Sequence, residues 1–129
     1  MLVVDASAVA GWLLPDEAGT DLAALLSAHV SICAPSLLWA ELRNILIVTE
    51  RRGRLPAGAA EQFLRIFDGL GVTLDTAPVE NEVLRLARQH RLTVCDALYL
   101  ELAMRSGGVL STLDRALAAA AGAEGIGLA

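Results

Sequence analysis

The sequence predicts an α/β fold of three layers, in which helices cover both faces of a central parallel sheet of four to five short strands. Two observations favour this fold. The expected strands are short apolar runs without the polar alternation of a half-exposed sheet, and helical spacing of apolar residues fills the stretches between them. The 129 residues make the length of one domain. No linker or repeat divides them, so we expect a single domain over residues 1–129.

The first quarter of the chain predicts strand, helix, helix and strand. Residues 2–4 are apolar and β-branched, as in a buried strand. Residues 8–14 favour a helix that ends before a proline. A second helix, running to residue 28, would begin at Asp16 and Glu17, since acidic residues suit a helix N-terminus. Residues 30–34 predict the second strand.

The middle of the chain predicts two long helices and a strand. Pro35 and Ser36 would open a helix that reaches Arg52 and is stopped by a glycine. Pro56 would open another, and residues 72–74 predict the third strand. The second of these helices has one apolar stripe, formed by Phe63, Ile66, Phe67 and Leu70.

The last third of the chain continues the alternation. A helix would begin at Pro78, and another would follow Thr93 and end at the glycines after Arg105. The face of the first comprises Val79, Val83, Leu86, Ala87 and His90. Residues 109–112 predict the fourth strand, Asp114 opens a short alanine-rich helix, and residues 125–128 predict a last edge strand.

Composition narrows the possible functions. The chain has 15 acidic and 10 basic residues, a formal net charge of −5, and every basic residue is an arginine. The lack of lysine excludes Schiff-base chemistry and the phosphate-binding P-loop. The acidic balance argues against simple electrostatic binding of nucleic acid.

Cysteine usage and hydropathy predict a cytoplasmic protein that does not bind membranes. No basic segment precedes the apolar start, as it would in a secretory signal, and no apolar run reaches the length of a membrane helix. Cys33 and Cys95 lack the spacing of metal ligands, and we expect two buried thiols in a reducing compartment.

Three aspartates stand where strands end or helices begin. Asp5 ends the first strand and Asp114 follows the fourth. Because the carboxyl ends of parallel strands meet at one edge of a sheet, we expect these two side chains to lie together. Each could instead cap the helix that follows. Asp96 has a similar alternative, since Thr93 precedes it with the spacing of a capping box.

Glu41 is the acidic residue least expected at the surface. Three of the four residues that lie three and four positions away on its helix are apolar. A carboxylate buried without a partner is costly. Its partner is either a distant arginine or a cation shared with the three aspartates.

A site built from carboxylates alone predicts one or two Mg²⁺ or Mn²⁺ ions, because hard divalent ions prefer oxygen ligands. His29 and His90 are expected as surface or border residues and not as ligands. Such acidic clusters chiefly serve phosphodiester hydrolysis, in which the ions activate a water molecule and neutralise the phosphate oxygens.

Four segments of the sequence resemble one known family. VVDASA at the start, APSLLWAEL around Glu41, LTVCDALYLELA around Asp96 and STLDRAL around Asp114 resemble the PIN-domain ribonucleases. Within that family the chain is most similar to the VapC-type toxins of toxin–antitoxin (VapBC) modules. The resemblance covers essentially the whole chain, and four motifs in this order are specific.

The resemblance implies a metal-dependent endoribonuclease, a hydrolase acting on RNA phosphodiesters through a metal-activated water. The products would carry 5′-phosphate and 3′-hydroxyl ends. The family's acidic, catalytic and metal-binding quartet corresponds by position to Asp5, Glu41, Asp96 and Asp114.

Two hydroxyl residues and two departures from the family pattern accompany the quartet. Thr112 matches a supporting hydroxyl position near the metals, and Ser7 could contact a metal-bound water. Cys95 stands where many members have an aromatic residue, which affects packing more than chemistry. Arg115 stands where some members have further acids, which would weaken a second metal site.

The family also implies partners: an RNA substrate, a second copy of the chain in a homodimer, and a cognate VapB-like antitoxin whose C-terminal segment lies in an apolar groove. Trp12, Leu13 and Trp39 could line that groove or the dimer interface, although core packing is the simpler role. Phe63 and Phe67 are open between the core and a dimer seam.

An acidic protein that binds RNA needs local positive charge. Arg51, Arg52 and Arg54 form a basic cluster after the Glu41 helix, and Arg43 lies earlier on it. They would contact phosphates, or they form a solvated helix end where positive charge also suits the helix dipole.

Two other functions fit the same residues. One is a non-catalytic PIN-like binding module, against which the complete acidic set argues. The other is a nuclease for DNA or for a particular nucleic-acid structure, which would use the same acidic metal site. The residues alone do not separate RNA from DNA.

Overall fold

The structure, a computed structural model, describes residues 1–14, 22–28 and 31–129. Four parallel strands form one sheet in the order β3-β2-β1-β4. Leu2 of the central strand pairs with Ile32 on one side and with Val109 on the other. The strands are β1 (Leu2–Val4), β2 (Ile32–Pro35), β3 (Thr73–Asp75) and β4 (Val109–Ser111). The α/β class is therefore confirmed.

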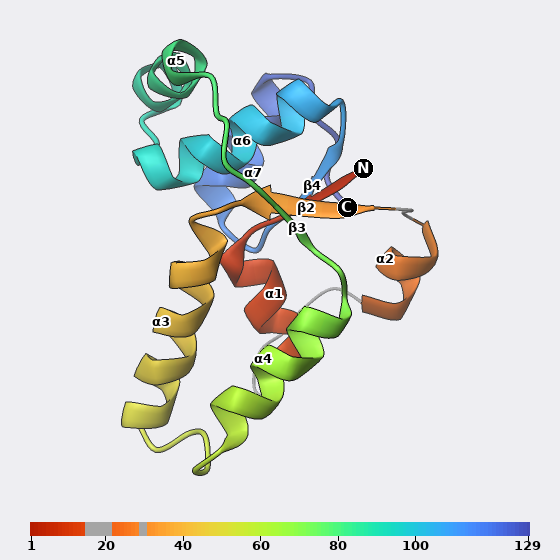
Figure 1. The fold of residues 1–129 in the computed structure, drawn as a ribbon. Coiled ribbons are helices and arrows are strands. Elements are labelled where there is room, and N and C mark those ends of the chain that lie inside the picture. The colour runs from red at the N-terminus through yellow and green to blue at the C-terminus, as the bar shows by residue number, and fades with distance from the viewer. Residues whose placement is uncertain (15–21, 29–30) are drawn as a thin grey trace.

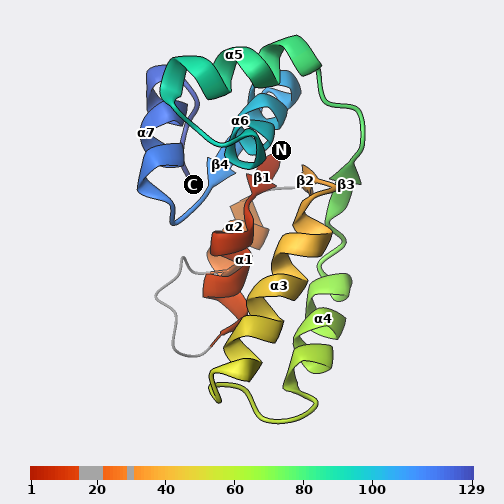
Figure 2. The ribbon, with the colours of Figure 1, turned by 90° about the vertical axis from the view of Figure 1, so that its left-hand side faces the viewer.

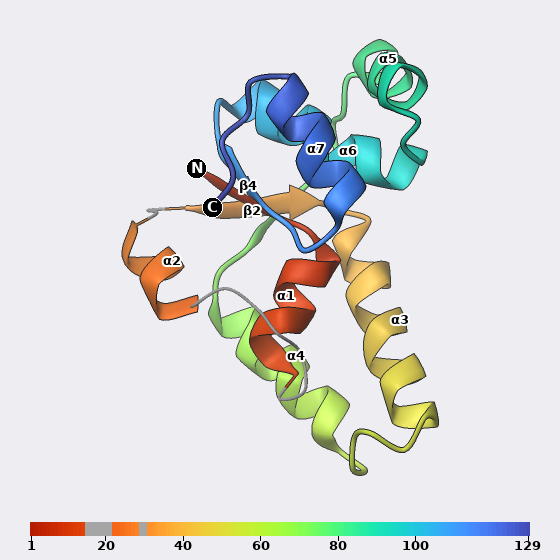
Figure 3. The same cartoon turned by 180° about the vertical axis from the view of Figure 1, so that it is seen from behind.

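Helices cover both faces of the sheet (Figures 1 and 3). One face carries α1 (Ala6–Leu13), α2 (Leu22–Ala28), α3 (Leu38–Arg51) and α4 (Ala59–Gly69). The other carries α5 (Glu80–His90), α6 (Val94–Ser106) and α7 (Arg115–Ala123). Within the described residues, no helix is long and apolar enough to cross a membrane.

The core lies between the sheet and the two helix layers. Every residue of β1 is fully buried, which explains its uninterrupted apolar sequence. Leu38, Leu42 and Leu46 repeat every four residues and bury one side of α3. This helix packs against α1 and α4, and Figure 2 shows α3 and α4 side by side, extending away from the sheet.

The chain returns to the sheet at the end of α6 through two glycines. Gly107 has a φ of +66°, a left-handed conformation that glycine adopts without strain. A Cβ atom on Gly108 would lie only 2.7 Å from the carbonyl oxygen of Met1. This close approach lets β4 begin directly beside β1, where the Val109 amide donates to the Met1 carbonyl at 3.1 Å.

Some expected elements differ in the structure. The strand expected at 125–128 is wrong: the end of the chain meets β4 only in a single bridge between Leu128 and Leu110. Its two glycines bring little side-chain surface to bury, and Leu128 stays exposed.

Two residues expected on the apolar face of a helix are exposed. Ile66 of α4 and Val79, which precedes α5, are both exposed, whereas Phe67 and Val83 beside them are buried. The helix start expected at Asp16 and Glu17 lies outside the described residues.

Candidate acidic metal site

The four predicted acids line one cavity at the carboxyl edge of the sheet. Asp5 directly follows β1, Glu41 lies in the first turn of α3, Asp96 in the first turn of α6, and Asp114 immediately before α7. The cavity has a volume of about 120 Å³. Its complete lining is Asp5, Ala6, Ser7, Glu41, Asp96, Tyr99 and Asp114.

Asp5 is the most deeply buried acid of the set, with 5% of its surface exposed. Its Oδ1 accepts hydrogen bonds from the Ser7 hydroxyl at 2.7 Å and the Ala8 amide at 2.9 Å, and its Oδ2 accepts one from the Thr112 hydroxyl. Burial raises the pKa of Asp5, the hydrogen bonds oppose this, and the charge of Asp114 raises it further. Asp5 is thus both the N-cap of α1 and a buried carboxylate of the cavity.

The hydroxyls of Ser7 and Thr112 connect the two loops that carry Asp5 and Asp114. Ser7 Oγ accepts the Leu113 amide at 2.9 Å, and Thr112 Oγ1 accepts the Asp114 amide at 3.0 Å. Both hydroxyls donate to Asp5. Each therefore fixes the Asp5 carboxylate relative to the loop after β4.

Asp114 and Asp96 both stand at the start of a helix, and their negative charges repel each other. Asp114 caps α7 through the Leu117 amide, which donates to its Oδ1 at 2.8 Å. Asp96 is half-buried, and its amide donates to the N-cap hydroxyl of Thr93 at 3.1 Å. Burial raises the pKa of Asp96, and the charges of Asp114 and Asp5 raise it further.

Glu41 is half-buried, and its partner is a tyrosine. The Tyr99 hydroxyl donates to Glu41 Oε1 at 2.5 Å, from a side chain of which only 1% is exposed. The alternative of a distant arginine is wrong for the described part of the chain, where every ion pair involves Arg85, His90 or Arg105. The pKa of Tyr99 is strongly raised by burial and by the hydrogen bond to Glu41, so the phenol stays a donor.

The site has the donor chemistry of a hard divalent ion. Its side chains offer only oxygen, and no described cation neutralises them. As they stand, however, no three Asp, Glu, His or Cys side chains of the described residues are close enough to hold one ion. Part of each carboxylate of Asp5, Glu41 and Asp114 is engaged with a protein donor. The set therefore fits Mg²⁺ or Mn²⁺ in kind, and binding requires the carboxylates to converge.

The arginines predicted to contact RNA differ in their surroundings. Arg51, Arg52 and Arg54 are exposed and form no ion pair with another described residue. The Arg43 guanidinium instead stacks 3.9 Å from the ring centroid of Trp39 and donates to the Trp39 carbonyl at 3.1 Å.

Two side chains, those of Trp39 and Cys95, depart from the burial expected of them. Trp39 is 56% exposed, so core packing is wrong for it, whereas Leu13 and Phe67 are buried as core packing requires. Trp12 and Phe63 are partly buried against the core. Cys95 is exposed while Cys33 is buried, so only one of the two thiols is enclosed.

The two histidines lie apart from the acidic cavity. His90 takes the expected border position, half-buried at the end of α5, where its Nε2 lies 2.8 Å from Glu124 Oε2. His29 lies outside the described residues.

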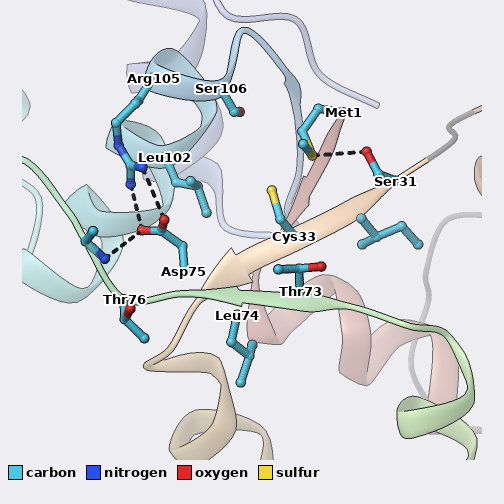
Figure 4. A pocket seen from close by; sticks show the side chains of 12 residues that line it. Met1, Ser31, Cys33, Thr73, Leu74, Asp75, Thr76, Leu102, Arg105 and Ser106 are labelled. Atoms are coloured by element: carbon cyan, nitrogen blue, oxygen red, sulfur yellow. Dashed lines mark hydrogen bonds and ion pairs between the residues drawn. The ribbon is translucent and has the colours of Figure 1, made fainter.

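A larger cavity, of about 400 Å³, shares no lining residue with the acidic one (Figure 4). At its wall Arg105 donates to Asp75 at 2.6 and 3.1 Å and to Glu101 Oε1 at 2.7 Å. Glu101, 3% exposed, also accepts the Val79 amide at 3.3 Å. These bonds join β3 and the start of α5 to α6.

Sequence reasoning did not single out Tyr99 or Glu101. A signal for Tyr99 is present: it lies three residues after Asp96, on the same side of the helix. A buried tyrosine hydroxyl needs a partner, and an acid of the same site supplies it.

Comparisons with known proteins agree with this architecture. The PIN domain family model matches residues 2–123. Ribonuclease VapC3 of Pyrobaculum aerophilum is 37% identical over 121 residues, which cover 91% of this chain and 92% of that protein. The crystal structure of PAE2754 from Pyrobaculum aerophilum is 31% identical with a TM-score of 0.72, covering 92% of this chain and 83% of that one.

A more distant structure shows the same fold. FitAcB from Neisseria gonorrhoeae has a TM-score of 0.65 at 17% identity, and the match covers 99% of this chain and 96% of that one. Because the family model spans nearly the whole sequence and the relative above is well over 30% identical, this chain belongs to the PIN domain family.

Proposed function

We propose that this protein is a metal-dependent endoribonuclease and the toxin of a type II toxin–antitoxin module. The observation that carries the proposal is the cavity lined by Asp5, Glu41, Asp96 and Asp114, four acids without a described counter-charge. The similarity to a protein named ribonuclease VapC3 over nine-tenths of both chains supports RNA as the substrate. We propose that the protein acts in the cytoplasm, where it would meet an RNA substrate.

The acids divide into roles that follow from their surroundings. Asp5, Asp96 and Asp114 would hold one or two Mg²⁺ or Mn²⁺ ions, and Glu41 would act as a further ligand or as the base that orients water. When bound, the ions would lower the pKa of water and neutralise charge on the phosphate. Ser7 and Thr112 hold the Asp5 carboxylate in place through its two oxygens.

Cleavage of a defined RNA by the purified chain tests the proposal. Wild type should cut a single-stranded RNA with Mg²⁺ or Mn²⁺ and stop in EDTA. Asp96→Asn should lose at least about 100-fold in rate, in the range that removing a charge-stabilising catalytic group causes. Asp68→Asn, which neutralises an exposed acid on α4, is the matched control and should cut like wild type.

The outcomes separate the candidate functions. A DNA strand of the same sequence is tested in parallel, and preferential cutting of DNA would replace the substrate. Antitoxin-free wild type that cuts neither strand with either ion would contradict the enzymatic proposal and favour a binding module. An Asp68→Asn variant as inactive as Asp96→Asn would show that loss of any acid, and not of this site, stops cleavage.

The exposed arginines at the end of α3 are proposed to guide the RNA backbone. Arg51 lies ten residues from Glu41 on the same helix, about 15 Å along its axis. Arg51→Glu with Arg52→Glu should weaken RNA binding and lower the slope of log affinity against log salt by roughly 2. Arg88→Glu, at an exposed arginine of α5, is the control. An unchanged slope would remove these residues from the RNA path.

We also propose that residues 1–129 act as one domain in a homodimer that binds a VapB-like antitoxin. Exposed apolar side chains at Trp39, Val79 and Val94 support an interface near the starts of α3, α5 and α6. Light scattering should give twice the chain mass of 13.5 kDa for wild type and the single mass for Val79→Asp. A monomeric wild type would contradict the dimer and leave the nuclease proposal intact.

A further inference from the structure

We infer that Tyr99 is a positioning residue for Glu41, which it holds in the cavity through the hydrogen bond from its hydroxyl to Glu41 Oε1. This inference rests on the proposed function, because it assigns a role within the acidic site. It concerns a residue that contacts the catalytic acid and not the RNA.

The first support is that Glu41 has no other described restraint. Glu41 stands on α3, and the bond from Tyr99 at 2.5 Å is the single side-chain hydrogen bond between α3 and any other element among the described residues. A glutamate side chain has several rotatable bonds and loses considerable rotamer freedom when it is fixed. Without the phenol, Glu41 would sample orientations that do not face the other acids.

The second support is the rigidity of the donor. Tyr99 of α6 is 1% exposed and belongs to the hydrophobic core, so its hydroxyl has a fixed place in the cavity wall. Tyr99 also lies one helical turn after Asp96. Through this bond α6 therefore sets the position of two acids, one that it carries and one that α3 carries.

The third support is that the bond engages only one of the two oxygens of the Glu41 carboxylate. Oε1 accepts the phenol, while no described group donates to Oε2. A charge-assisted bond to one oxygen is short and strong, and it leaves the second oxygen for an ion or a water molecule. Glu41 can thereby bind an ion or a water molecule while it keeps the hydrogen bond from Tyr99.

Tyr99→Phe tests the inference, because it removes the hydroxyl and keeps the ring in the core. A hydrogen bond to a charged group is strong enough to change an equilibrium by about 10-fold or more. We expect kcat for RNA cleavage to fall about 10-fold with KM for RNA within about twofold of wild type. We expect the Kd for Mn²⁺, measured without RNA by the electron paramagnetic resonance of free Mn²⁺, to rise about fivefold or more.

Two further variants separate positioning from ordinary stability. Thr49→Val removes a hydroxyl from the same helix, where it donates to the Ile45 carbonyl at 2.7 Å, and should leave kcat and Mn²⁺ affinity unchanged. In a Glu41→Gln background, Tyr99→Phe should cause much less further loss of residual cleavage, because the two residues act as one unit. Equal losses in both backgrounds would overturn the inference.

The result for wild type distinguishes the two proposals. If wild type binds Mn²⁺ and cuts RNA while Tyr99→Phe matches it in kcat and Kd, the positioning role is wrong and the proposed function stands. A lower melting temperature with both constants unchanged would mean that the hydroxyl serves folding alone. If wild type neither binds Mn²⁺ nor cuts RNA, the proposed function fails and the role of Tyr99 falls with it.

Discussion

Removal of Arg105 should destabilise the fold without disabling the acidic site. Arg105→Met leaves Glu101, which is 3% exposed, without the cation that lies 2.7 Å from its carboxylate. Breaking a fully buried ion pair from one side costs about 3–5 kcal/mol. Because the Arg105 side chain is 32% exposed, and its pair with Asp75 is screened by water, we expect about 2–3 kcal/mol.

The melting temperature reports this loss. For a domain of this size, 2–3 kcal/mol corresponds to a decrease of about 6–15 °C. Adding Glu101→Gln should recover a large part of it, because the glutamine keeps an acceptor for the Val79 amide and removes the buried charge. RNA cleavage well below the melting temperature should be unchanged, since Arg105 does not line the acidic cavity.

Arg88→Met is the matched control, because Arg88 is exposed and has no ion pair among the described residues. It should melt within about 2 °C of wild type, as most surface substitutions do. An Arg105→Met protein that loses less than about 0.5 kcal/mol would refute the reasoning. So would a double variant whose losses simply add.

Three further results are expected. Arg105 lowers the pKa of Asp75 below its ordinary value, so this pair stabilises the fold above that ordinary value, and the contribution is lost as pH falls through the lowered pKa. In Arg105→Met the free energy of unfolding should therefore fall less steeply between neutral and acid pH than in wild type. Ser7→Ala should cost about 1.5–3 kcal/mol in urea unfolding, since it removes a donor to the buried aspartate of the site; a loss under about 0.5 kcal/mol would contradict that bond. A thiol reagent should modify Cys95 in the native protein and Cys33 only after unfolding; equal rates would contradict their burial.

The strands were predictable because their chemistry is local. The run at β1 is buried on both faces, and such runs read the same in sequence and in structure. The strand expected at the end of the chain is wrong because pairing there depends on a distant partner, β4. The two glycines of this segment bring little side chain to pack, and a single bridge forms, at Leu128. Helix beginnings shifted by up to three residues; α1, for example, starts at Ala6 because Asp5 caps it.

The acidic site was predictable to the extent that topology determines it. Asp5 and Asp114 were placed together by the rule for parallel strands, and the cavity contains both. The capping alternative proved compatible with that placement, because each caps a helix and lines the cavity at once. Tyr99 was missed because its partner lies 58 residues away in the sequence, and no local pattern connects them.

The exposure of single side chains was the least predictable property. Helical spacing puts Trp39 near an apolar stripe, yet the indole lies outward and is covered on one face by Arg43. Cys95 was expected in the core, but it stands in the exposed first turn of α6. Both residues stand in the first turn of a helix, where a sequence pattern places the helix boundary only to within about one or two residues.

The order of the strands has a consequence for when the proposed nuclease can act. The first strand of the chain is central in the sheet, and its neighbour β4 is the last strand to be synthesised. Asp5 takes its hydrogen bond from Thr112 only after that neighbour has paired. A nascent or truncated chain that ends before β4 carries three of the four acids and lacks the fourth. A complete acidic site, and with it the proposed cleavage, therefore requires an almost complete chain.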